Sequence, residues 1–127
     1  MQPSSEHSTL AALLAEQRAL ETLVNNAGPG AEEAIAMGRA LLVFAEQEDA
    51  AFSALSSLLD PAAQQELADE HQEIAADLSL LDWLLQTTPD SPDVPVLTAS
   101  LLRRMRQHID RDGRLLTRAA ALRSAAG

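Results

Sequence analysis

Leucine and alanine recur every three or four residues along four long segments of this chain, and no other sequence feature constrains the fold as strongly. This spacing places the apolar side chains on one face of an α-helix, whereas alternate residues share a face in a β-strand. The chain is also poor in the residues that strands favour, with two Phe, one Trp and no Tyr. We therefore predict an all-α protein, in which residues 1–127 form one domain with a single core.

Turn and capping signals divide this spacing into four helices. Gly28, Pro29 and Gly30 form a turn, Asp60 with Pro61 indicates a helix start, and a loop rich in proline and aspartate follows the third segment. Long amphipathic helices with short links predict an antiparallel, up-down-up-down four-helix bundle. The expected helices run from just after Ser4 or Ser5 to the first turn, from about residue 31 to 59, from 61 to about 87, and from about 95 onward.

Polar side chains interrupt the apolar face of every expected helix. On the fourth helix, His108 and Asp112 lie one turn apart, at positions where apolar side chains are expected. Burying a carboxylate without a partner is costly, so these two groups need one. They could hydrogen-bond to each other in the core, or they could bind a metal ion. The polar residues on the other three helices are His7, Asp49 with Glu46 beside it, and His71.

The first and third helices share a short repeat. Residues 6–14 and 70–78 are identical at five of nine positions, and a Glu-His pair opens both segments. Asp49 follows His7 by 42 residues, and Asp112 follows His71 by 41. The chain therefore reads as two copies of a helix pair, although chance similarity between Ala- and Leu-rich helices is the alternative. In this alignment Ala45 takes the place of the histidine at position 108.

Helix geometry predicts that the polar residues meet. With a rise of about 1.5 Å per residue, Asp49 and His71 each lie about 15 Å from the link between the second and third helices. His71 lies about 24 Å before the next loop, and residues 108–112 lie about 20–26 Å after it. His7 lies about 27 Å before the first turn, at the level of residues 45–49, about 21–27 Å after it. Five polar groups at one level favour a metal site over five separately satisfied side chains.

Imidazole and carboxylate ligands suit iron, with manganese or zinc as alternatives. His71, His108 and Asp112 have the composition of a two-histidine, one-carboxylate iron(II) site with open positions. The other copy could hold a second ion, with Glu46 either replacing the missing histidine or remaining solvated. No catalytic or cofactor-binding residue is predicted beyond the metal ligands, which are His7, Glu46, Asp49, His71, His108 and Asp112.

This pattern resembles the hemerythrin-like family, also called the HHE cation-binding domain, over nearly the whole chain. The family's hallmark is His on the first helix, His-x-x-x-Glu on the second, His on the third and His-x-x-x-Glu on the fourth. The first and third elements of this hallmark match His7 and His71. The fourth matches residues 108–112 (His-Ile-Asp-Arg-Asp), with Asp in place of Glu. The second corresponds to residues 45–49 (Ala-Glu-Gln-Glu-Asp), which lack the histidine. The resemblance implies a four-helix bundle with a non-haem di-iron centre that binds or senses dioxygen, or reacts with peroxide or nitric oxide.

The remaining features bear on partners and location. A formal net charge of −10 argues against nucleic acid and anionic membranes as partners. The start of the chain lacks the regions of a signal peptide and no apolar run could span a membrane, so we expect a cytoplasmic protein. Trp83 points away from the apolar face and could form a homodimer contact. Gly113, beside Asp112 inside the fourth helix, could leave room near a site, but we interpret it as a tolerated surface glycine. The alternative function is a metal-free interaction or regulatory module, which Ala45 and the shortened acids support.

Overall fold

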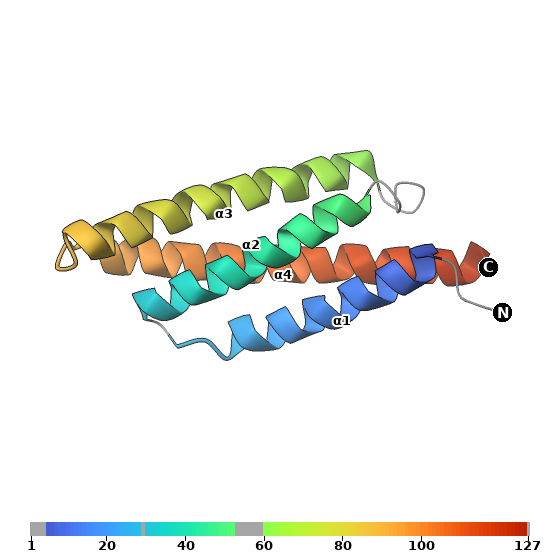
Figure 1. Ribbon diagram of the computed structural model, residues 1–127, viewed down its shortest axis with the longest axis horizontal. Coiled ribbons are helices and arrows are strands. Elements are labelled where there is room, and N and C mark those ends of the chain that lie inside the picture. The colour runs from blue at the N-terminus through green and yellow to red at the C-terminus, as the bar shows by residue number, and fades with distance from the viewer. Residues whose placement is uncertain (1–4, 29, 53–59, 127) are drawn as a thin grey trace.

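The computed structural model describes residues 5–28, 30–52 and 60–126, except for the side chains of residues 5–9, 52 and 126. This part of the chain forms four helices and contains no strand, which confirms the all-α prediction. Figure 1 shows that each helix runs in the opposite direction to the one before it. The third helix has the predicted bounds, whereas the predicted end of the second, at residue 59, lies outside the described residues. The helices are α1 (Ser5–Asn25), α2 (Ala31–Phe52), α3 (Pro61–Thr87) and α4 (Asp93–Ala126).

Side-chain caps explain where α3 and α4 begin. The backbone N–H of Ala62 donates to the Asp60 carboxylate at 3.2 Å, and Pro61 occupies the first turn, where a missing N–H does no harm. At α4 the backbone N–H of Asp93 donates to the Ser91 hydroxyl at 3.2 Å. Ser91 is therefore the capping side chain, and Asp93 begins the helix, where its negative charge suits the N-terminal end of the helix dipole.

The four helices surround one apolar core, and α2 approaches α4 across it. Contacts join α1 to α2, α2 to α3, α3 to α4 and α4 to α1, and α2 also contacts α4. Between the described residues, α1 and α3 make no such approach, so the α2–α4 diagonal is the short one. This diagonal brings inward-facing side chains of α2 close to those of α4. No helix in the described part of the chain is long and apolar enough to cross a bilayer.

Gly113 lies where the side chain of Gln17 crosses from α1 to α4. Gln17 is 2% exposed, and its Nε2 donates to the backbone carbonyl of Ile109 at 2.9 Å. A Cβ atom on residue 113 would lie 2.6 Å from that Nε2, which is closer than real Cβ contacts allow. The interpretation of Gly113 as a tolerated surface glycine is therefore wrong, because its missing side chain makes room for the Gln17 amide.

We expect the effect of Gly113→Ala on stability to depend on Gln17. Alanine gains about 1 kcal/mol of helix propensity over glycine. In the native protein its methyl group displaces the Gln17 amide, whose hydrogen bond contributes roughly 1 kcal/mol, so the net change is near zero or destabilising. With Gln17→Ala already present, the gain of about 1 kcal/mol should appear in full. Urea denaturation of the four proteins in this cycle measures the difference, and equal effects in both backgrounds would contradict the packing role.

Candidate metal centre

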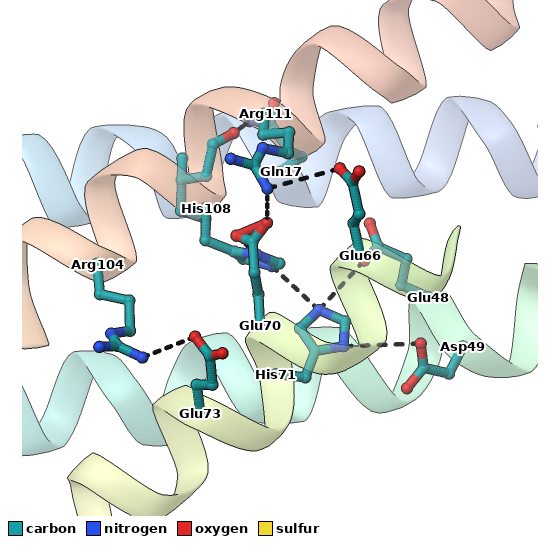
Figure 2. Close-up of polar contacts among 11 residues, drawn as sticks. Gln17, Glu48, Asp49, Glu66, Glu70, His71, Glu73, Arg104, His108 and Arg111 are labelled. Carbon is teal, nitrogen blue, oxygen red and sulfur yellow. Dashed lines mark hydrogen bonds and ion pairs between the residues drawn. The ribbon is translucent and has the colours of Figure 1, made fainter. Parts of the chain in front are cut away.

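Two histidines face each other inside the bundle, one from α3 and one from α4. Nε2 of His71 lies 3.0 Å from Nε2 of His108, and the ring centroids are 4.7 Å apart with an interplanar angle of 69°. Both imidazoles are buried. Figure 2 shows them turned toward each other, with Glu48 and Asp49 reaching toward His71 from α2. The prediction that these two histidines meet at one level of the bundle is confirmed.

Two buried carboxyl groups, Glu48 of α2 and Asp112 of α4, complete the cluster. Oε1 of Glu48 lies 3.6 Å from Nε2 of His71, and one ligand atom each from Glu48, His71 and His108 fall within 4.8 Å of one another. Glu48 and Asp112 are both 0% exposed. No other described group donates to their four carboxylate oxygens, so the two acids have only each other as hydrogen-bond partners. Because buried polar atoms are nearly always paired, Glu48, His71 and His108 could hold a metal ion, and Asp112 lies beside Glu48.

Burial shifts the pKa values of the cluster toward neutral side chains. Burial, and then the adjacent carboxyl of Asp112, raise the pKa of Glu48 to about 11. Burial also raises the pKa of Asp112, although a hydrogen bond with Glu48 and the two nearby histidines oppose this. Burial and the nearby imidazole of His108 lower the pKa of His71. A divalent cation would favour the ionised form of the two acids, because carboxylates bind metals in that form. It would also suit neutral imidazoles, which bind through an unprotonated nitrogen.

Each imidazole has another carboxylate near its Nδ1 atom. Nδ1 of His108 lies 2.9 Å from Oε2 of Glu70, which is a hydrogen bond. Nδ1 of His71 lies 3.7 Å from Oδ1 of Asp49, which is longer than a hydrogen bond. The Glu70 carboxylate favours a proton on Nδ1 of His108 and leaves the Nε2 lone pair of that ring for a metal, as is common for metal-binding histidines. Both Nε2 atoms face the interior of the cluster.

Arginines of α4 contact the acids of α3 from the solvent side. Arg111 pairs with Glu70 through its Nη1 atom and also lies 3.8 Å from Glu66. One turn further along α3, Glu73 accepts a hydrogen bond from Nη1 of Arg104 at 2.7 Å. The Glu70 side chain is only 16% exposed, whereas that of Arg111 is 54% exposed. Glu70 therefore lies at the boundary between the buried imidazole of His108 and the surface.

The prediction that Asp49 faces the interior is wrong. Its side chain is 52% exposed, and Glu48 takes the buried position. Buried positions of α2 include 34, 38, 41, 45 and 48, with alternating steps of four and three. These positions form one inward-facing stripe of the helix, and from Ala45 the stripe continues to Glu48. A step of four from Ala45, as in the family motif, leads instead to Asp49 on the flank.

The other predicted ligands of the first copy do not join the cluster in the described part of the chain. Glu46 is exposed on α2, which agrees with the alternative that it remains solvated. Ala45 is 3% exposed, so a residue without a donor atom occupies the position of the missing histidine. His7 belongs to α1, but its side chain lies outside the described residues. Glu48 and Glu70 are the two residues of the site that sequence reasoning missed.

Comparison of this chain with protein-family models, with curated proteins and with solved structures finds no match. The resemblance to the hemerythrin-like family therefore stays a prediction. The case for a metal centre rests on the side chains themselves.

Proposed function

We propose that this protein binds one divalent transition-metal ion, iron(II) in the first place, between α2, α3 and α4. The ligands are Nε2 of His71, Nε2 of His108 and the carboxylates of Glu48 and Asp112. The observation that carries this proposal is the pair of fully buried acids, Glu48 and Asp112, which have only each other as hydrogen-bond partners and lie beside two facing imidazoles. Burying such acids destabilises the fold, and a bound cation removes that penalty.

The donor set supports iron and a single ion. Two imidazoles with carboxylates suit iron(II), and manganese or zinc remain alternatives. Such a site supplies a metal with open positions for a small oxidant such as dioxygen, peroxide or nitric oxide, the ligands that the family resemblance implies. The second predicted ion loses Asp49 as an interior ligand, because that side chain is 52% exposed and lies beside Nδ1 of His71. Leu67 and Met105, one turn before His71 and His108 on their helices, are buried, so we expect that only small molecules reach the ion.

A metal-free interaction module is the second candidate function. It is favoured by Ala45, which is buried at the level of the cluster and provides no ligand atom. The two candidates differ in what they require of Glu48 and Asp112: a metal site uses them as ligands, whereas an interaction module leaves both acids without a role.

Metal content after reconstitution distinguishes the two. We expect about one equivalent of iron per chain after anaerobic loading with iron(II) and gel filtration, measured by plasma mass spectrometry. Iron should also raise the thermal midpoint in proportion to the logarithm of its free concentration, because the ion binds only the folded chain. The matched control is Glu46→Gln, which changes an exposed acid on α2 and should retain full loading. Less than about half an equivalent of iron, manganese or zinc would contradict the proposal and favour the interaction module.

A further inference from the structure

We propose that Glu70 is a positioning residue that sets the imidazole of His108 for metal binding, and that Arg111 holds Glu70 in place from the surface. This inference rests on the proposed function, because it concerns the orientation of one ligand in that site. It assigns a role to a side chain that is not itself a ligand. Two contacts of the same carboxylate carry it, one to a buried ring and one to an exposed guanidinium.

The contact with His108 determines which ring nitrogen carries the proton. Oε2 of Glu70 lies 2.9 Å from Nδ1, and a carboxylate can only accept at that distance, so Nδ1 must donate. In a neutral imidazole the lone pair then lies on Nε2, the atom that is 3.0 Å from Nε2 of His71. Without a metal, the Nε2–H group of His71 donates to that lone pair, and Nδ1 of His71 has no hydrogen-bond partner in the described structure. The opposite tautomer of His108 would point a hydrogen into the cluster and could not bind a metal through Nε2.

The contact with Arg111 determines which oxygen of Glu70 faces the ring. Arg111 donates to Oε1, which leaves Oε2 for His108, so both carboxylate oxygens are used and the group cannot rotate freely. Arg111 follows His108 by three residues on α4, and residues three apart lie on neighbouring turns of one helix face. His108 and Arg111 of α4 therefore contact the Glu70 carboxylate of α3 from opposite sides, as Figure 2 shows.

Glu73 provides an internal comparison for an ordinary ion pair. It lies three residues after Glu70 on α3, and it accepts from Arg104 of α4 at 2.7 Å. Its side chain is 58% exposed, and no contact with an imidazole is seen among the described residues. If Glu70 only joined α3 to α4, the two glutamates would behave alike.

The test compares Glu70→Gln and Glu70→Ala with the control Glu73→Gln, using zinc(II) as the probe and competition with a chromogenic chelator as the measurement. In Glu70→Gln the amide oxygen should accept from Arg111, because a guanidinium only donates, and the amide NH₂ then faces Nδ1 of His108. That NH₂ favours the wrong tautomer, whereas alanine leaves the ring free to choose. We expect zinc affinity to fall by about 10- to 100-fold in Glu70→Gln, the range for losing a histidine's outer partner. Glu70→Ala should show a smaller loss, and Glu73→Gln should match the wild type.

The same proteins without metal provide a readout that does not depend on the proposed function. The ¹⁵N shifts of the His108 ring should show a protonated Nδ1 in the wild type and in Glu73→Gln, and a protonated Nε2 in Glu70→Gln. A wild-type protein that binds no metal but shows this tautomer pattern would overturn the proposed function and leave the positioning role standing. An Nε2–H ring in the wild type would overturn the role of Glu70. An equal loss of affinity in Glu73→Gln, or a milder effect of Gln than of Ala, would do the same.

Discussion

Replacing His108 by alanine is expected to abolish stoichiometric metal binding. The ring supplies one of the two nitrogen donors of the described cluster, and its loss leaves His71 with two carboxyl groups. Affinity for zinc(II) or iron(II) should fall by more than about 100-fold, because losing even an outer partner of a ligand costs about 10- to 100-fold. Metal should also no longer raise the thermal midpoint, since that rise depends on preferential binding to the folded chain.

The control for this substitution is Gln107→Ala, which removes the preceding, exposed side chain on α4. That protein should bind metal as the wild type does and respond equally to a chelator. If His108→Ala retained its metal content and its thermal response, the ion would bind elsewhere and the cluster would be a feature of the core alone.

Replacing Glu48 by methionine should remove metal binding and yet stabilise the metal-free protein. The carboxyl group is 0% exposed, and Asp112 is its hydrogen-bond partner among the described residues. Burial holds Glu48 protonated and also raises the pKa of Asp112, so methionine removes a buried polar group without leaving a fixed charge behind, and such an exchange is often neutral or stabilises by about 1–4 kcal/mol. We expect a gain within that range in the presence of a chelator, measured by urea denaturation. A loss of stability in Glu48→Met, or wild-type zinc affinity, would contradict the assignment of Glu48 as a ligand.

The pH dependence of folding stability is a second test of how the buried Glu48 carboxyl affects the metal-free protein. The pKa of Glu48 is raised from 4.5 to about 11, so the folded protein retains a proton that the unfolded chain has released. The corresponding stability is fully present below pH 4.5 and is lost as the pH rises toward 11. The lowered pKa of His71 acts in the opposite sense, but only below its ordinary value of 6.5. Between about pH 7 and pH 10 the metal-free wild type should therefore lose stability, and Glu48→Met should flatten that slope. Metal affinity should instead increase with pH, because protons compete with the ion for the same atoms.

The helices and the meeting of the two histidines could be predicted because they depend on capping residues and residue counts along the sequence. Asp60 and Pro61 mark the start of α3, and the structure places it there. The level of His71 and His108 follows from residue counts on either side of one loop, since the rise per residue is constant. The sequence alone could not settle the rotation of α2. Glu48 and Asp49 are adjacent residues, and the rotation of α2 about its axis, which its packing against α3 and α4 sets, decides which of them is buried.

Glu70 was missed for a different physical reason. It lies on the flank of α3, where a long acidic side chain can extend into solvent or lie across the neighbouring helix. Which of these occurs depends on the spacing between α3 and α4 and on Arg111, neither of which a periodic pattern reveals. One signal was present, because glutamate precedes histidine in both copies of the repeat at residues 6–7 and 70–71.

The buried acids in the interior have a consequence for the amount of this protein in a cell. If they are metal ligands, the unloaded chain is the weaker of its two forms and opens more often. Proteases degrade chains that open, and a difference of one or two kcal/mol can change steady-state abundance several-fold. Newly made copies would then persist when the ion is plentiful and be cleared when it is scarce, so the level of the protein would follow the metal supply without a dedicated regulator.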